Sequence, residues 1–231
     1  MTNQSLTIKK EIVMSQANKL KVAVIGIGNI GSAVATNLVK GNRPVIVADR
    51  KLAKAETLAQ KLGSLAQPSE ISAAIKEADI VVLAIYFDPI KEFLKQYATE
   101  LEGKIIVDPS NPIAPAENGG FKKIIDENES AGQILSTQLP KGAKLAKALG
   151  SLGVASLASA AFQQQEQAVL FYATDDTSIN GEIEQLIRDS GFEPVRVGGL
   201  DQSIRLEVFG DLHEFGALGK TVTVTEANEK L

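Results

Sequence analysis

Short apolar runs alternate with amphipathic stretches through the first half of the chain. Apolar runs bounded by turn residues predict buried strands, and these lie at residues 21–25, 45–48, 80–85 and 104–107, with a very short one at 64–66. Apolar residues recurring every three or four positions predict helices after Gly31 and at 52–62, 70–78 and 89–100, with Ser69 as N-cap of the third. This alternation with short connections predicts a Rossmann-type doubly wound parallel sheet with helices on both faces, an α/β fold.

The pattern becomes mixed in the second half. Residues 108–120 carry three prolines and Gly119-Gly120, which predict a loop. Beyond them, strands are predicted at 144–149, 168–173 and 192–197, helices at 178–190 and 200–215, and a mostly helical or irregular stretch at 124–139. We therefore expect a Rossmann domain at residues 21–115, extended by a smaller mixed α/β C-terminal part at 116–231.

Composition narrows the classes of function. The 231 residues include 24 Lys and Arg against 28 Asp and Glu, a net charge of −4, so the basic field of a nucleic-acid binder is missing. The absence of cysteine and the single histidine, His213, argue against disulfides, thiolate catalysis and a metal site. No apolar run approaches the roughly 20 residues of a membrane span, and residues 1–20 form a polar leader without signal-peptide features. We expect a cytoplasmic protein with no membrane or nucleic-acid partner.

Three glycines follow the first predicted strand. Gly26, Gly28 and Gly31 form a G-x-G-x-x-G motif that opens the first helix. In such motifs the first glycine permits the tight turn, the second lets a pyrophosphate approach the backbone, and the third lets helix and strand pack closely. Free N–H groups at the start of the helix then face the phosphates. Asp49 ends the second strand 18 residues later, where an acidic residue commonly binds an adenosine ribose, so the sequence predicts a dinucleotide site.

The residues around Asp49 leave the choice of dinucleotide open. The Asp49 carboxylate would hydrogen-bond the ribose of NAD and repel the 2′-phosphate of NADP. Arg50 and Lys54 favour NADP, because a guanidinium and an ammonium bind phosphate. Alternatively, both are solvated charges at the start of a helix. We expect NADP, with NAD as the alternative.

Three segments should meet where the parallel strands end, because ligands of open α/β sheets bind there. They are the glycine loop, the run Ala84-Ile85-Tyr86-Phe87 and residues 109–112. Tyr86 or Phe87 would wall the nicotinamide pocket, unless both belong to the core. Asn111 would hydrogen-bond the carboxamide or ribose beside Pro112, unless this pair is only a turn.

No residue stands out as a general acid or base. His213 lies near the end of the last predicted helix, and a surface or structural role explains it better than catalysis does. The residues therefore favour a reaction between two redox cofactors, such as nicotinamide and a flavin-like ring. Such a reaction mainly needs the two rings to stack at near-attack distance.

The order of several motifs resembles a family of small NADP-dependent oxidoreductases, typified by the deazaflavin coenzyme (F-420):NADP oxidoreductase. It is also similar to the N-terminal oxidoreductase domain of the six-transmembrane epithelial antigen metalloreductases. The likeness covers roughly residues 20–219. It rests on VAVIGIGNIGSA (22–33), Asp49-Arg50, VDPSNP (107–112), KGAKLAKALGSLG (141–153), AVLFYAT (168–174) and LIRDSGFEP (186–194).

The resemblance implies contacts with the dinucleotide. Gly28, Asn29, Ile30 and Gly31 match the loop that binds pyrophosphate in the family, and Arg50 and Lys54 match the residues that hold the 2′-phosphate. Asp49 stands where the family has serine, and Ala148-Leu149-Gly150 stands where it often has Ala-Phe-Asn. Contacts with the electron acceptor are therefore not carried over.

We predict an NAD(P)-dependent oxidoreductase that transfers a hydride between a nicotinamide cofactor and a small-molecule acceptor, a flavin or deazaflavin, with residues 116–231 completing the acceptor site. The alternatives are a non-catalytic NAD(P)-binding redox-sensing module and a substrate-specific imine or carbonyl reductase. The polar stretch 220–231 is predicted to pair with the sheet edge of another subunit in a homodimer. The expected cofactor-binding residues are Gly26, Gly28, Asn29, Ile30, Gly31, Asp49, Arg50, Lys54, Ala84, Ile85, Tyr86, Asn111 and Pro112.

Overall fold

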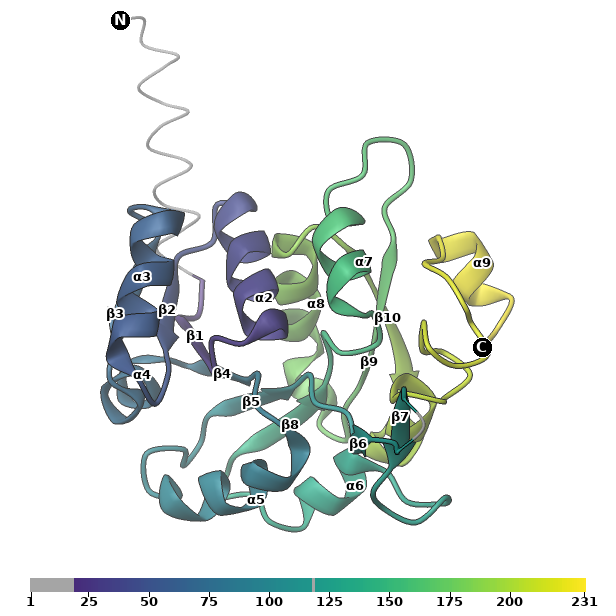
Figure 1. The fold of residues 1–231 in the computed structure, drawn as a ribbon, viewed down its shortest axis with the longest axis horizontal. Helices are drawn as coiled ribbons and strands as arrows, with labels where there is room; N and C mark the ends of the chain where they lie inside the picture. The colour runs from purple at the N-terminus through teal and green to yellow at the C-terminus, as the bar shows by residue number, and fades with distance from the viewer. Residues whose placement is uncertain (1–18, 118) are drawn as a thin grey trace, which may run out of the picture.

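An eight-stranded sheet runs through the middle of the protein (Figure 1). The computed structural model describes residues 19–117 and 119–231, so nearly all of the predicted polar leader lies outside the described residues. The strand order is β10-β9-β8-β5-β4-β1-β2-β3. The strands are β1 (Val22–Ile25), β2 (Val45–Ala48), β3 (Ala66–Ser69), β4 (Ile80–Leu83), β5 (Ile105–Asp108), β8 (Lys144–Lys147), β9 (Val169–Ala173) and β10 (Glu193–Gly198).

The sheet is parallel from β3 to β8 and mixed beyond. Strand β1 pairs in parallel with both β2 and β4, and the parallel pairing continues through β5 to β8. Strand β9 is antiparallel to β8, which it meets at Lys147 and Ala173, and β10 is parallel to β9. The predicted doubly wound sheet with a mixed C-terminal extension is therefore confirmed. The chain leaves β1 toward β2 on one side and returns to β4 on the other, so the order reverses between β1 and β4, where such folds bind ligands.

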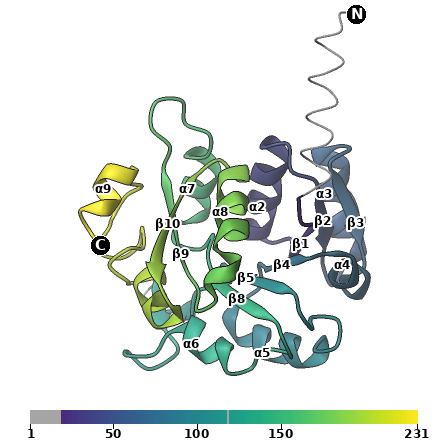
Figure 2. The ribbon, with the colours of Figure 1, turned by 180° about the vertical axis from the view of Figure 1, so that it is seen from behind.

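Helices cover both faces of the sheet (Figures 1 and 2). One face carries α2 (Asn29–Lys40), α3 (Leu52–Leu62), α7 (Val154–Ser159) and α8 (Asn180–Asp189), and the other carries α4 (Ile71–Glu77), α5 (Phe87–Gln96) and α6 (Ala131–Ser136). In β1, Val22 and Val24 pack on the first group while Ala23 and Ile25 pack on the second. Because both faces are buried, strands β1, β2 and β4 are apolar at every position, as is typical of parallel sheets.

The segment after β10 does not form the predicted helix over residues 200–215. It forms a 3-10 helix, η2 (Leu200–Leu206), and then a series of turns. Phe209 has φ +78°, and a Cβ on Gly210 would collide with the carbonyl oxygens of Ile204 and Arg205, so an α-helix cannot continue here. The apolar spacing that suggested a helix instead buries Leu206 and Leu212 against the outer face of β9.

The C-terminal stretch packs on the sheet of its own chain. Residues 220–231 contain a short helix, α9 (Val224–Asn228), opened by a capping box between Thr223 and Glu226. Val222 is buried on β9, and the Val169 N–H donates to its carbonyl at 2.9 Å. The stretch therefore packs on its own sheet, and pairing with a second subunit stays a prediction.

Several element boundaries were predicted wrongly. The third strand begins at Ala66, and not at residue 64, and it includes Ser69, so Ser69 does not cap the next helix; Glu70 does, without a side-chain bond. Helix α5 begins at Phe87, two residues before the predicted Pro89. Where a loop was predicted, β6 (Ile113–Pro115) and β7 (Phe121–Lys123) pair as a two-stranded hairpin. The prediction missed this hairpin because its strands are too short to show an alternating pattern.

Candidate functional site

The carboxyl ends of four parallel strands meet at one edge of the sheet. Strand β1 ends in the glycine loop, β4 in Ala84-Ile85, β5 in residues 109–112, and β8 in Leu149-Gly150. Gly26 packs so closely on Ala84 and Ile85 that a Cβ would lie 2.6 Å from the Ala84 carbonyl oxygen and from Ile85 Cγ2. Gly150 packs just as closely on Pro109, because a Cβ on Gly150 would collide with the Pro109 carbonyl oxygen. Two neighbouring pairs of these strand ends are therefore in direct contact.

The three glycines of the motif are not equivalent. Gly26 has φ +93°, and a Cβ on Gly31 would collide with the Gly26 carbonyl oxygen, so the fold itself requires these two. Gly28 is different: it has φ −85°, and apart from its chain neighbours no atom of the described residues lies within 4 Å of the position of a Cβ. The protein leaves open the space that a side chain at Gly28 would fill, as a pyrophosphate site requires.

Helix α2 begins at this open space. Gly28 is its N-cap, and among the described residues no side chain caps the helix and no acidic residue lies in its first turn. The first N–H groups of a helix have no partner within it, and here they belong to Asn29, Ile30 and Gly31. Together with the positive end of the helix dipole, they form an anion-binding surface.

Asp49 is tied to the glycine loop. Its Oδ2 accepts a hydrogen bond from the Ile27 N–H at 3.0 Å, and its Oδ1 accepts one from the Lys51 N–H at 3.1 Å. Partial burial acts to raise the pKa of Asp49, but these two bonds and the charges of Lys54 and Arg50 outweigh it, so the pKa lies below its ordinary value. The carboxylate is therefore ionised and oriented beside the loop.

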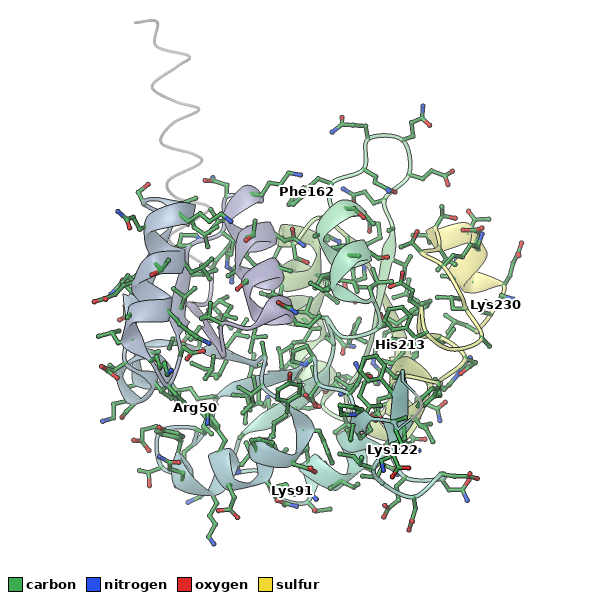
Figure 3. All side chains as sticks on the ribbon, in the orientation of Figure 1. Arg50, Lys91, Lys122, Phe162, His213 and Lys230 are labelled. Atoms are coloured by element: carbon green, nitrogen blue, oxygen red, sulfur yellow. The ribbon has the colours of Figure 1, made fainter. Side chains whose placement is uncertain are left out.

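Two hollows flank Asp49. One of about 490 Å³, between α2 and α3, is lined by Ser32, Lys51, Lys54 and Lys61 among others. The second, of about 300 Å³, is lined by Asp49, Arg50, Glu70, Ile71, Ser72 and Tyr97. Lys54 thus lines the first hollow and Arg50 the second, in the region where a nucleotide on the loop would place its adenosine end. Figure 3 shows Arg50 in the half of the molecule formed by β2 and α3, far along the sheet from His213.

The two candidate aromatics have different environments. Tyr86 is 86% exposed just before α5, at the carboxyl end of β4. Phe87 is 2% exposed and belongs to the core beneath the sheet. Only Tyr86 is therefore placed to border a ligand, and Phe87 is a core residue.

Asn111 and His213 hold the loops of this edge together. Asn111 Nδ2 donates to the Gly150 carbonyl at 3.2 Å, and Asn111 Oδ1 accepts from the Val208 N–H at 2.7 Å. His213 Nε2 lies 3.1 Å from the same Gly150 carbonyl, and its Nδ1 accepts from the Phe215 N–H at 2.9 Å. Burial lowers the pKa of His213 to about 4, so the ring is neutral and structural. Asn111 keeps at most one N–H for a ligand.

One ion pair at this edge was missed by the sequence analysis. Lys147 Nζ lies 2.8 Å from Asp108 Oδ2, donates to the Ser110 carbonyl, and is buried with Asp108 between β5 and β8. The signal was present: Lys147 is a lysine inside an apolar run, on the same side of its strand as Leu145. A lysine at an inward position of a strand indicates a buried acidic partner.

The chain is similar in sequence to known oxidoreductases. Residues 21–112 match the family described as NADP oxidoreductase, coenzyme F420-dependent. The F420-dependent NADP reductase of Methanocaldococcus jannaschii is 34% identical over 107 residues, 42% of this chain and 48% of the relative. The metalloreductase STEAP3 of Rattus norvegicus is 24% identical over 187 residues, 81% of this chain and 36% of the relative. The resemblance inferred from the motifs is thereby confirmed.

A solved structure extends the likeness over nearly the whole chain. A hypothetical protein of Sinorhizobium meliloti is 28% identical, with a TM-score of 0.77 over 90% of this chain and 97% of that chain. By contrast, the chain matches only about half the length of the first curated relative and about a third of the second. Of the helices in residues 19–117 and 119–231, none combines the length and apolar composition needed to cross a bilayer.

Proposed function

We propose that this chain is an NADP-dependent oxidoreductase. The proposal is supported by the match of residues 21–112 to the family described as NADP oxidoreductase, coenzyme F420-dependent. The chain binds the dinucleotide at the carboxyl edge of the sheet and exchanges a hydride with a flavin or deazaflavin. The open space at Gly28 carries the proposal, because the other two motif glycines are explained by packing and this one is not.

The chain's own residues supply binding and orientation. The N–H groups of Asn29, Ile30 and Gly31 would hold the pyrophosphate over Gly28. Asp49 would accept a hydrogen bond from the adenosine ribose. Arg50 and Lys54, whose positive charges act on Asp49, would offset its repulsion of a 2′-phosphate and hold that phosphate.

The nicotinamide end would lie toward β4 and β5. When bound, the reduced nicotinamide supplies the hydride. Ala84 and Ile85, Tyr86, and the loop at Asn111 and Pro112 border that end, and exposed Tyr86 offers a flat surface against which a planar acceptor could stack. Because the histidine is neutral and fully hydrogen-bonded, an acceptor with its own redox-active ring suits this site.

Steady-state oxidation tests this function. The protein is mixed with NADPH or NADH and with riboflavin, FMN or a deazaflavin, and loss of reduced nicotinamide is followed. We expect oxidation of NADPH with at least one of these acceptors. Binding of NADPH without oxidation by any of them would instead identify a non-catalytic sensing module.

The role of Asp49 is tested by cofactor preference. Asp49→Ser removes a negative charge next to the expected 2′-phosphate, so the ratio of kcat/KM for NADPH to that for NADH should rise about tenfold, ~1.4 kcal/mol. Asp79→Ser is the matched control, because Asp79 also accepts a backbone N–H, from Lys21 at 2.8 Å, but precedes β4 at the opposite end of the strands. An equal ratio in all three proteins would place Asp49 away from the ribose.

A further inference from the structure

Three buried oxygen atoms without hydrogen-bond partners lie close to the carboxyl edge. Among the described residues, five buried side-chain atoms lack a partner, and Ser110 Oγ, Ser151 Oγ and Glu207 Oε2 are three of them. Each such atom costs about 1–3 kcal/mol when nothing satisfies it. A cluster of them in a native fold points to bound water or to a functional role.

The three atoms belong to one neighbourhood. Ser110 follows β5, and its carbonyl accepts a hydrogen bond from Lys147 at the end of β8. Ser151 follows Gly150, which packs directly on Pro109, the residue before Ser110. The charge of Glu207 interacts with those of Lys147 and Asp108. Three segments that are far apart in the sequence thus lie around the Asp108–Lys147 ion pair.

Glu207 carries its two oxygens in different states. It is 1% exposed, and its Oε1 accepts hydrogen bonds from the Ala131 N–H at 2.9 Å and from Ser203 Oγ at 3.3 Å. Its Oε2 has no partner. Burial raises the pKa of Glu207, and the positive charge of Lys147 and the bond from Ala131 only partly offset this. Burial therefore makes Glu207 easier to protonate than an exposed glutamate, and Oε2, which has no partner, is the oxygen that can carry the proton.

Lys147 completes the group. Its ammonium has three N–H donors, and Asp108 and the Ser110 carbonyl take two of them. The third donor, the two serine hydroxyls and Glu207 Oε2 provide four polar partners, which suffices for internal water. His213 also faces this group electrostatically, but its nitrogens are already bonded to Gly150 and Phe215.

We propose that Glu207, Lys147 and the hydroxyls of Ser110 and Ser151 hold internal water and form a relay that delivers a proton to the redox acceptor. The proposal rests on the proposed function and names a source for the proton that a neutral acceptor can take up after the hydride. Glu207 and Lys147 are too deeply buried to touch the acceptor, so they act through water and Ser110, the residue next to the loop that borders the site.

The step balances as follows. A neutral acceptor that takes a hydride gains two electrons and one proton and becomes an anion. One further proton, released by the Glu207 O–H and passed through water and the Ser110 hydroxyl, neutralises that anion. Glu207 is left as a carboxylate beside Lys147 and regains a proton from solvent. The hydride itself comes from the reduced nicotinamide of the proposed function.

The first test compares two kinds of hydride acceptor. In mildly acidic buffer, where the test is run, riboflavin becomes an anion that takes up the extra proton after the hydride, whereas N-methylacridinium is a cation that a hydride alone makes neutral. In Glu207→Gln the amide oxygen can still accept from Ala131 but the group cannot release a proton, so turnover with riboflavin should fall at least tenfold while turnover with N-methylacridinium stays within twofold. Equal losses with both acceptors, or no loss with either, would overturn the relay.

A matched variant guards against a general packing effect. Glu214 also holds a helix start, accepting from the Gly153 N–H at 2.6 Å and from the Ser156 hydroxyl, but both of its oxygens are partnered. Glu214→Gln should therefore leave the ratio of the two rates unchanged. A solvent deuterium isotope effect on the riboflavin reaction should be present in the wild type and in Glu214→Gln. The size of this isotope effect should be different in Glu207→Gln, because the proton then reaches the acceptor by another route and its delivery limits the rate.

The last readout does not depend on activity. In the protein without cofactor and with ¹³C-labelled glutamate carboxyls, the resonance that disappears in Glu207→Gln should titrate at higher pH than the exposed glutamates. Titration of Glu207 together with them would overturn the relay. If no acceptor is reduced by wild-type protein, the proposed function fails, and this measurement still decides whether Glu207 holds a proton.

Discussion

Two buried ion pairs lie at opposite ends of the parallel strands. Arg43 precedes β2, and its guanidinium lies 2.8 Å from Asp189 at the end of α8. Asp189 also accepts from Lys19 and from Gln185, and Arg43 also donates to the Leu20 carbonyl. Among the described residues, no buried atom of this group lacks a partner.

The pair at the other end is less completely satisfied. Lys147 and Asp108 are as deeply buried as Arg43 and Asp189, but Ser110, Ser151 and Glu207 around them each leave one oxygen unpaired. A polar group used only for structure gains from complete pairing. The contrast favours a purely structural role for the Arg43 pair, and it is the basis on which the relay is proposed for the Lys147 cluster.

The largest expected effect comes from breaking the Lys147 pair. In Lys147→Met the Asp108 carboxylate stays buried without a cation, which should lower the free energy of unfolding by about 3–5 kcal/mol. Urea denaturation followed by circular dichroism measures this. The double variant Lys147→Met/Asp108→Asn should recover part of the loss. A single variant as stable as wild type would mean that Asp108 is not held ionised by Lys147.

The next effect concerns pH. The folded pKa of His213, about 4, lies below its unfolded value of about 6.5, so the unfolded chain binds more protons between these values. Stability from this residue is complete above pH 6.5 and is lost as pH falls toward 4, by at most ~3 kcal/mol. Asn can keep the contact of Nδ1 with the Phe215 N–H and does not titrate in this range, so His213→Asn should flatten the urea midpoint between pH 6.5 and 4 relative to wild type. Parallel curves for the two proteins would show that His213 is not held neutral.

A smaller effect is expected at the opposite end. Arg43→Met leaves Asp189 with Lys19 and Gln185, so the loss should be about 2 kcal/mol, less than for Lys147→Met. Oxidation of NADPH per folded molecule should not change, because this pair lies away from the site. An activity loss larger than the folded fraction explains would remove the distinction between the two pairs.

The sequence predicted the part of the site whose residues lie close together along the chain. The three glycines, the strand before them and Asp49 lie within about 30 residues, and short-range periodicity places each on its element. The same reasoning assigned the pyrophosphate to Gly28 and the turn and the packing to Gly26 and Gly31, but it could not show which atoms block a Cβ at each position. Those atoms belong to Ala84 and Ile85, after β4, for Gly26, and to the Gly26 carbonyl for Gly31.

The other half of the edge could not be predicted in this way. Asp108, Lys147 and Glu207 come together only because β5 pairs with β8 and η2 packs against α6. The segment after β10 was predicted as one helix over residues 200–215. Tertiary bonds, such as that from the Val208 N–H to Asn111, determine its actual path.

The central claim is that Gly28 stays free of a side chain to admit a dinucleotide. Titration of the chain with NADPH measures this directly, since reduced-nicotinamide fluorescence has little background in a protein without tryptophan. Gly28→Val should fold normally and weaken binding about a hundredfold, ~2.7 kcal/mol, whereas Gly181→Val, at an equally open position on α8, should bind like wild type. Equal affinity for NADPH in all three proteins would contradict the account.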